Sequence, residues 1–382
     1  MVRNMYLNGL LTAVVAVACL VTTASPSFAQ VARDDDPTIG RGLVTPVRQW
    51  RDATQDPRGV VLLLHGFPEH SLLYDKLASR LAFDGFIVYA PDLRGLGRAY
   101  TDGTATEISY IKYADKDIAR LAERIRKEHK GLKVVVGGES MGGALAIRLA
   151  AQHPELVDGV MLSGPAIKLE HHYARLIPRS LVNVVTLGVV KVDFSKQIEK
   201  FFSADSRIAR ELLRDPLVRT KFDTKELIET RQFPRETEKF VDQISEKTPV
   251  LVLQSCDDRQ VSPKGLCLFD AKLRSQDVTY VVFTFGGHTL LQTKHIDPFA
   301  EKAVIEWLDR QVPPVDGAAC RLPKLNAPKN EVPQQLPKND FPQAPKNDVP
   351  RQMPKYDVPQ PMPQPKTDGR QSVEPMIIPE PK

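Results

Sequence analysis

Residues 133–150 constrain the fold of this chain more than any other stretch, because they predict a buried strand, a tight turn and a helix in immediate succession. The valines at 134–136 are typical of a strand that is covered on both faces. Apolar residues then recur at helical spacing, at Ala144, Leu145, Ile147, Leu149 and Ala150. A chain with this stretch therefore needs a sheet against which strand and helix are both buried.

The turn within this stretch has the sequence Gly138-Glu139-Ser140-Met141-Gly142, a G-x-S-x-G pattern. Glycines two residues before and two residues after the serine leave room for a sharp strand-to-helix turn. In such an elbow the serine hydroxyl stands clear of the sheet, beside the unpaired N–H groups at the start of the helix. Glycine and serine are common in turns, so a purely structural turn is the alternative; the flanking strand and helix favour a catalytic Ser140.

Strands and helices alternate on both sides of the elbow. Apolar runs predict buried strands at 60–64, 86–90, 157–162, 250–255 and 278–284, with an edge strand near 47–50. Helical periodicity marks 72–81, 117–130 and 298–310. This alternation predicts an α/β fold with a mostly parallel sheet, helices on both of its faces, and ligand chemistry at the C-terminal ends of the strands. We assign the core to two parts, 30–166 and 248–312.

Residues 167–247 interrupt this alternation and predict a helical insertion without a convincing strand. Residues 176–192 within it are unusually apolar. Two interpretations stay open. The insertion is either an ordinary helical layer on the core or a lid whose apolar inner face meets a lipid substrate or a membrane surface.

The first 29 residues have the pattern of an export signal. Arg3 supplies the charge, residues 10–21 the apolar centre, and Ser27-Phe28-Ala29 a small-x-small cleavage site. We therefore expect a mature chain that begins near Gln30 and is periplasmic or extracellular. The alternatives are an uncleaved anchor, for which the apolar run is short, and a lipid-modified Cys19.

Residues 313–382 predict a disordered, proline-rich tail. The segment 328–333 recurs at 337–342, at 345–350 and, with a tyrosine, at 354–359. Such a sequence has too little apolar content to bury a core, so we expect an extended and partly polyproline chain. It is either a solvated spacer or a contact to the cell envelope or a partner.

Charge and cysteine content limit the partners. The 52 basic and 47 acidic residues are interspersed and give a net charge of +5, which offers no basic face for nucleic acid. Export would leave Cys256, Cys267 and Cys320 in an oxidising compartment. A Cys256–Cys267 disulfide would close a short loop and Cys267–Cys320 a longer one; three free thiols are the alternative.

Ser140 needs two further catalytic groups, because a serine hydroxyl is a poor nucleophile near neutral pH. An imidazole must take its proton, and a carboxylate must orient that imidazole. His288 directly follows a predicted strand and a Gly-Gly pair, and His295 is the alternative base. Asp257 and Asp258 follow the strand 250–255. The order serine, acid, histidine is that of α/β-hydrolases.

The chain resembles α/β-hydrolases of the monoacylglycerol lipase and lysophospholipase type, which are similar to serine aminopeptidases. The likeness runs from Val60 to Leu308 and rests on His65-Gly66-Phe67 with Glu69-His70-Ser71, on residues 138–143, on residues 251–263, and on Asp215-Pro216-Leu217-Val218. It implies that Asp258 is the acid, with Asp257 as its rival. It also implies that the backbone N–H groups of Phe67 and Met141 form the oxyanion hole.

These observations predict an exported serine hydrolase of carboxylic esters, monoacylglycerols or lysophospholipids above all, that acts through an acyl-enzyme. We expect neither a cofactor nor a metal, since no cluster has ligand spacing. An aminopeptidase-like relative is the alternative enzyme. A non-catalytic binding protein held in the envelope by its tail is the alternative of another class.

Overall fold

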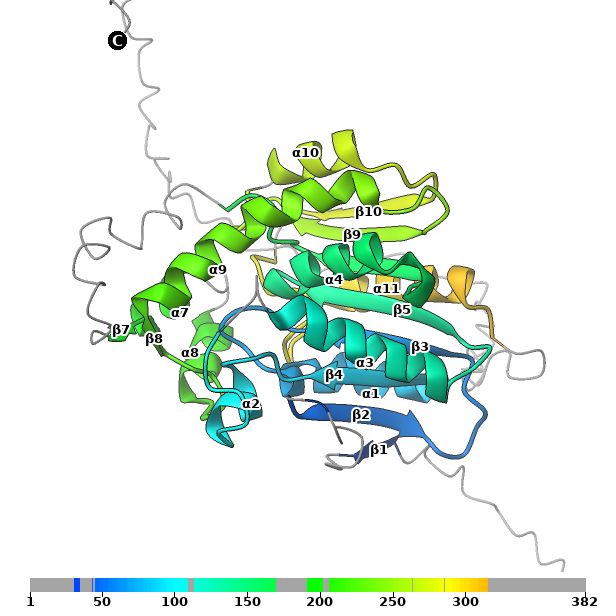
Figure 1. The fold of residues 1–382 in the computed structure, drawn as a ribbon, viewed down its shortest axis with the longest axis horizontal. Coiled ribbons are helices and arrows are strands. Elements are labelled where there is room, and N and C mark those ends of the chain that lie inside the picture. The colour runs from blue at the N-terminus through cyan, green and yellow to red at the C-terminus, as the bar shows by residue number, and fades with distance from the viewer. Residues whose placement is uncertain are drawn as a thin grey trace, which may run out of the picture. The chain divides into compact units, whose positions relative to one another are not determined.

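A computed structural model describes residues 31–34, 43, 45–108, 113–169, 191–201, 206–262, 264–284 and 286–314 (Figure 1). The expected export signal, the proline-rich tail and most of the apolar stretch 176–192 lie outside the described residues. No helix among the described residues is both long and apolar enough to cross a membrane.

A sheet of eight strands forms the centre, in the order β1-β2-β4-β3-β5-β6-β9-β10. β1 and β2 run antiparallel to their neighbours, and all other adjacent pairs are parallel. The strands are β1 (Val31–Asp34), β2 (Val47–Asp52), β3 (Gly59–Leu64), β4 (Phe86–Pro91), β5 (Lys133–Glu139), β6 (Gly159–Ser163), β9 (Val250–Ser255) and β10 (Val278–Phe283). The mostly parallel sheet predicted from the sequence is confirmed.

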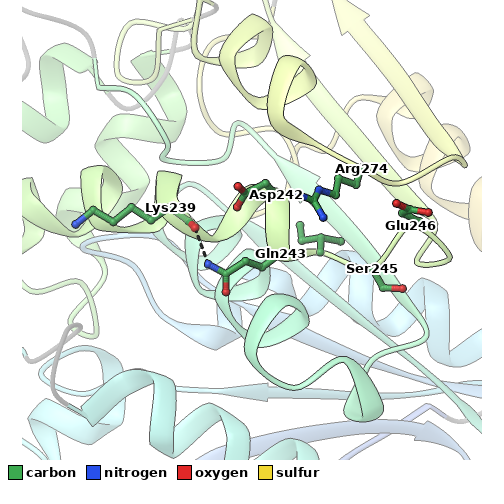
Figure 2. Close-up of a pocket in the computed structure, with 7 residues that line it drawn as sticks. Lys239, Asp242, Gln243, Ser245, Glu246 and Arg274 are labelled. Carbon is green, nitrogen blue, oxygen red and sulfur yellow. Dashed lines mark hydrogen bonds between the residues drawn. The ribbon is translucent and has the colours of Figure 1, made fainter.

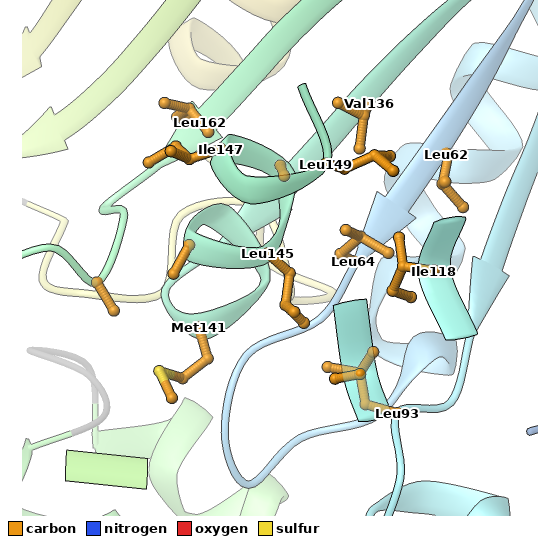
Figure 3. Packing of buried hydrophobic residues seen from close by; sticks show 14 of the residues in the cluster. Leu62, Leu64, Leu93, Ile118, Val136, Met141, Leu145, Ile147, Leu149 and Leu162 are labelled. Carbon is orange, nitrogen blue, oxygen red and sulfur yellow. The ribbon is translucent and has the colours of Figure 1, made fainter. Parts of the chain in front are cut away.

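Two layers of helices cover the sheet because its central strands are apolar on both faces. Val60, Leu62 and Leu64 of β3 face one core cluster, and Val61 and Leu63 face the other. The first cluster includes the inner sides of α3 (Asp115–Glu128) and α4 (Met141–Gln152), as Figures 1 and 3 show. The second includes α1 (Asp75–Phe83) and α11 (Pro298–Gln311).

Short helices complete the core at the ends of the strands. They are η1 (Ser71–Tyr74), α2 (Gly97–Thr101), η3 (Pro154–Leu156) and α10 (Lys264–Lys272). The strand near 47–50 was predicted to be an edge strand, and this is wrong: β1 pairs along the outer side of β2. The sequence before β2 is polar and gives little signal for such a partner.

The insertion lies at the end of the sheet where the parallel strands finish (Figure 1). Its helices are α7 (Ser195–Phe201), α8 (Ser206–Arg214), α9 (Thr224–Thr237) and η5 (Glu238–Gln243). It also holds a two-stranded antiparallel sheet of β7 (Lys191–Asp193) and β8 (Lys221–Asp223), so the prediction that it contains no strand is wrong. Each strand has only three residues, too few for a period-two pattern to be recognised.

Buried polar contacts fasten the insertion to the core. The guanidinium of Arg219 pairs with Glu226 and donates to the carbonyl oxygen of Gly95 at 3.1 Å. Glu226 in turn accepts from the N–H of Ile108 at 3.0 Å. His70 Nε2, in the loop after β3, lies 3.1 Å from the Asp215 carboxylate. The base of the insertion is therefore held by hydrogen bonds to core loops as well as by apolar packing.

Cys256 and Cys267 are both exposed and unpaired, so the structure does not support a disulfide between them. Cys256 follows the end of β9 and donates its N–H to Phe283 of β10, whereas Cys267 lies within α10. Cys320 lies outside the described residues.

The close approach of α4 to β3 predicts a large loss of stability in Gly142→Ala. A Cβ at Gly142 would lie 1.8 Å from the carbonyl oxygen of Leu64, so helix and strand would have to separate. We expect the free energy of unfolding to fall by about 3 kcal/mol, the upper range for overpacking, in urea denaturation.

Gly131→Ala is the control for this experiment. A Cβ at Gly131 meets nothing within 4 Å, but its φ of +85° is unfavourable for alanine. We expect a loss of about 1 kcal/mol from that backbone conformation. Equal losses in the two variants would contradict the close-packing argument.

Candidate active site

Ser140 lies at the tip of the elbow, one residue after β5 and one before α4. Its φ of 56° makes it the one non-glycine residue with positive φ in the described part of the chain. Hydrogen bonds hold this strained backbone. The Ser140 N–H donates to the carbonyl oxygen of Ser163 at 2.9 Å, and the Ser140 carbonyl accepts from Ala166 at 2.9 Å. Strain that the surroundings enforce in this way is typical of a functional residue.

His288 and Asp258 form a buried pair on loops that follow β10 and β9. His288 Nδ1 donates to Asp258 Oδ2 at 2.8 Å, and the two side chains are 3% and 1% exposed. Gly286 and Gly287, with φ of +137° and +67°, turn the chain so that the ring points inward. His288 Nε2 is buried and has no hydrogen-bond partner in the described part of the chain.

The two aspartates predicted as rivals have different partners. Asp258 accepts from the N–H groups of Gln260 and Val261 at 2.8 and 2.9 Å with the oxygen that does not face His288. Asp257 instead accepts from the Ser255 hydroxyl and from the N–H of Gly287. The geometry therefore brings Asp258 to the imidazole and leaves Asp257 holding the backbone of the loop that leads to it.

His295, the alternative base, lies elsewhere. Its Nε2 is 3.1 Å from Glu211 of α8, and its side chain is 41% exposed. His65 is fully buried, donates from Nδ1 to the Gly66 carbonyl and accepts at Nε2 from the N–H of Leu93, both at 2.8 Å. Burial lowers the pKa of His65 to about 4, so this ring is neutral and holds the loop after β3.

The end of β6 brings the serine and the histidine together. Ser163 accepts the N–H of Ser140, and the next residue, Gly164, packs against the acid–base pair. A Cβ at Gly164 would lie 3.2 Å from Asp258 Oδ2 and 3.4 Å from His288 Nδ1. The backbone of Ser140 and the Asp258–His288 pair therefore both border the end of β6, at the C-terminal edge of neighbouring parallel strands, and among the residues that the structure describes no hydrogen bond joins Ser140 to His288 Nε2.

Phe67 and Met141, whose N–H groups are the expected oxyanion donors, flank Ser140. Both residues are buried, at 3% exposure. Met141 is the first residue of α4, where backbone N–H groups lack intrahelical acceptors. A Cβ at Gly66 would lie 3.2 Å from Ser140 Cβ, so the loop that carries Phe67 passes directly beside the serine.

Aromatic rings of the insertion cover this loop. The ring centroid of Phe67 lies 4.7 Å from that of Phe222 and 5.4 Å from that of Phe194. Phe194 precedes α7 and Phe222 lies in β8, and both are buried. The insertion thus gives the site an apolar cover, which excludes water from charges that form beneath it.

A polar hollow lies on the surface away from Ser140, Asp258 and His288. A surface hollow of about 380 Å³ is lined by the polar residues Lys239, Asp242, Gln243, Ser245, Glu246 and Arg274 with Ile244, and none of the candidate catalytic residues contributes to it (Figure 2). No three His, Cys, Asp or Glu side chains of the described ranges are grouped so that they could hold a metal ion.

Sequence reasoning missed Glu139. Its carboxylate is buried and accepts from the Ser163 hydroxyl and from the N–H groups of Leu290 and Leu291, which follow His288. The available signal was an acidic residue at the end of an otherwise apolar strand. Arg219 and Glu226, which fasten the insertion, were also missed, because their pairing depends on tertiary structure.

The pKa of His288 reflects opposing influences. Burial, the largest single influence, lowers it; the charge and hydrogen bond of Asp258 and the charge of Glu139 raise it, and together they raise the pKa above the usual value for histidine. The nearby carboxylates therefore favour the imidazolium that a general base becomes when it accepts a proton.

Comparisons with known proteins identify the family of the chain. The model of the family described as serine aminopeptidase, S33, matches residues 55–294. The chain is 27% identical over 237 residues to a monoacylglycerol lipase of Mycolicibacterium smegmatis, covering 60% of this chain and 80% of that protein. It is 27% identical over 253 residues to human monoglyceride lipase, covering 64% and 79%.

Solved structures show the same fold. A monoacylglycerol lipase of Paleococcus ferrophilus superposes with a TM-score of 0.57 at 24% identity, over 70% of this chain and 99% of that one. A soluble variant of monoglyceride lipase from Saccharomyces cerevisiae, in complex with a substrate analogue, superposes with a TM-score of 0.60 at 20% identity, over 75% and 98%. The predicted α/β-hydrolase fold is confirmed.

The contacts of the two aspartates predict different effects on the His288 titration. We expect the pKa of His288 in the wild type, as followed by NMR of its ring protons, to be raised from the usual value for histidine. Asp258→Asn should lower this pKa, because the imidazolium loses its nearest anion. In the control variant Asp257→Asn the pKa of His288 should stay near that of the wild type. A lowered His288 pKa in Asp257→Asn alone would contradict Asp258 as the partner of His288.

Proposed function

The chain belongs to the serine aminopeptidase S33 family of α/β-hydrolases, and from this premise we propose that it hydrolyses carboxylic esters through Ser140, His288 and Asp258. The observation that carries the proposal is the buried His288–Asp258 pair, which borders the same end of β6 as the strained backbone of Ser140. A structural turn would need neither the strain nor a buried imidazole whose outer nitrogen has no partner in the described part of the chain.

The proposed reaction has two steps. His288 Nε2 takes the hydroxyl proton as Ser140 Oγ bonds to the ester carbonyl carbon, and the resulting imidazolium gives that proton to the departing alcohol oxygen. Water then loses a proton to Nε2 and attacks the acyl-enzyme, and the same proton returns to Ser140 Oγ as the carboxylic acid leaves. Asp258 keeps the proton of Nδ1 in place throughout, so Nε2 is free to accept.

The backbone N–H groups of Phe67 and Met141 would stabilise the oxyanion of each tetrahedral intermediate. Both belong to buried residues beside Ser140, and Met141 begins a helix whose dipole favours negative charge. Donors fixed in this way need no rearrangement as the charge develops, which is why such sites accelerate acyl transfer.

Monoacylglycerols are the substrates we favour, with lysophospholipids as the next class. Proteins named monoacylglycerol or monoglyceride lipase are similar to this chain over most of their own length. The apolar cover of Phe194 and Phe222 over Phe67 supports an acyl chain rather than a charged group next to the reacting carbon. Because the family is described as serine aminopeptidase, S33, cleavage of a peptide bond after an N-terminal residue is the alternative reaction.

We further propose that the protein is exported, with cleavage before Gln30, and that the insertion contacts lipid at a membrane surface. The pattern of residues 1–29 supports the first idea and the apolar stretch 176–192 the second. The tail would then act at the cell envelope. Fractionation of the native host followed by mass spectrometry tests both parts: protein found in the cytoplasm would contradict export, and an exported protein that keeps residues 1–29 would contradict cleavage.

Ser140→Ala tests the reaction itself. We expect the wild type to hydrolyse a monoacylglycerol, a lysophospholipid and short acyl esters, and the variant to lose at least about 10⁴-fold in kcat, because the nucleophile is removed. An aminoacyl p-nitroanilide tests the peptidase alternative in the same assay. Turnover that persists in Ser140→Ala, or a folded wild type that cleaves neither ester nor amide, would contradict the proposal.

A further inference from the structure

Glu139 is a buried carboxylate immediately before the proposed nucleophile. It is the last residue of β5 and is 1% exposed. Its Oε2 accepts from the Ser163 hydroxyl at 2.6 Å, from Leu290 N–H at 2.9 Å and from Leu291 N–H at 2.8 Å. One oxygen atom therefore joins the end of β6 to the loop after His288.

The hydrogen bonds of Glu139 fix the backbone that carries the proposed base. Leu290 and Leu291 are two and three residues beyond His288, so their N–H groups determine where the loop turns back toward β5. The next residue, Gln292, accepts the N–H of Gly66 at 2.8 Å and links the same loop to the residue before Phe67. Base, nucleophile and one oxyanion donor are thus tied to one buried group.

Glu69 is a second buried carboxyl next to Glu139. A Cβ at Gly66 would lie 3.0 Å from Glu69 Oε2 and 3.3 Å from the Glu139 carbonyl oxygen, so the two residues flank the same glycine. Glu69 Oε1 has no hydrogen-bond partner among the described residues. Two such carboxyls cannot both ionise in a dry interior. The Ser163 hydroxyl and the N–H groups of Leu290 and Leu291 donate to Glu139, so Glu139 is the ionised carboxylate of the two and Glu69 is protonated.

We propose that Glu139 is a positioning residue for His288, whose hydrogen bonds hold the base loop and whose negative charge stabilises the imidazolium formed during catalysis. This inference rests on the proposed function. Glu139 is the first variable residue of the G-x-S-x-G pattern. Its role differs from that of Asp258, which contacts the imidazole directly.

The titratable groups near Glu139 and His288 come from several elements. Burial is the largest single influence on the pKa of His288 and lowers it, but Asp258, after β9, and Glu139 together raise it above the usual value for histidine. Burial and the charge of Glu139 raise the pKa of Glu69 well above its usual range. Burial, Glu139 and Glu69 do the same for Tyr74, which stays neutral and donates to the Leu64 carbonyl at 2.9 Å. Burial also raises the pKa of Glu139 itself, while the Ser163 hydroxyl, the charge of His288 and the N–H groups of Leu290 and Leu291 lower it. These donors and the opposite charge of the imidazolium make Glu139 the member of the cluster that holds the negative charge.

Glu139→Gln and Glu69→Gln form a matched pair of variants. The glutamine oxygen at 139 can still accept from Leu290 and Leu291, whereas its NH2 group faces the N–H of Gln292, which donates to Glu139 Oε1 at 3.4 Å in the wild type. That variant removes the charge, keeps the length of the side chain and gives up this one long contact. We expect kcat on an ester substrate to fall roughly tenfold, and the acid limb of the kcat–pH profile to move down by about one pH unit, because His288 loses a neighbouring anion. KM should not change, since Glu139 does not touch substrate. Glu69→Gln replaces a neutral acid by a neutral amide and should leave the acid limb in place.

The outcomes are distinguishable. A folded wild type that hydrolyses no ester refutes the proposed function, whereas an active wild type with an identical profile in Glu139→Gln refutes this inference alone. If Glu139→Gln does not fold, Glu139→Asp takes its place: it keeps the charge but its shorter side chain cannot reach both N–H groups, so kcat should fall while the acid limb stays. An unchanged kcat in Glu139→Asp, or failure of both variants to fold, would make Glu139 a residue of stability only.

Discussion

The contact of α4 with the end of β3 is the constraint on which the site depends. Gly142 lies so close to the carbonyl oxygen of Leu64 that no side chain fits between them, and a Cβ at Gly138 would lie 2.3 Å from the backbone of Gly142. This approach forces the chain to reverse within a few residues, which puts Ser140 in a left-handed conformation at the edge of the sheet. Backbone hydrogen bonds from β6 then hold it there.

The parallel sheet explains why residues far apart in sequence gather around that serine. Parallel strands end at the same edge, so loops after β3, β5, β6, β9 and β10 share one small volume. Each loop contributes a group of a different kind: a backbone donor near Phe67, the nucleophile, a backbone acceptor on Ser163, the acid and the base. The insertion then covers the Phe67 loop with its own aromatic rings.

Much of this arrangement could be predicted from the sequence, because short-range patterns carry it. Runs such as the valines at 134–136 mark buried strands, and the glycines around Ser140 mark the elbow. The choice of Asp258 over Asp257 came from a resemblance, since adjacent aspartates have the same local signal. What the sequence could not reveal depends on contacts between distant segments: the pairing of Arg219 with Glu226, the three-residue strands of the insertion, and the bonds from Glu139 to the base loop.

The most direct measurement of the central claim is covalent labelling with an alkyl fluorophosphonate, followed by peptide mass spectrometry. An activated serine displaces fluoride and forms a stable Oγ–P bond, and a serine without a base beside it does not react. We expect one phosphonyl group per molecule, on Ser140, and none when Asp258 or His288 is replaced by asparagine. Labelling of another serine, or no labelling of a folded wild type, would contradict it.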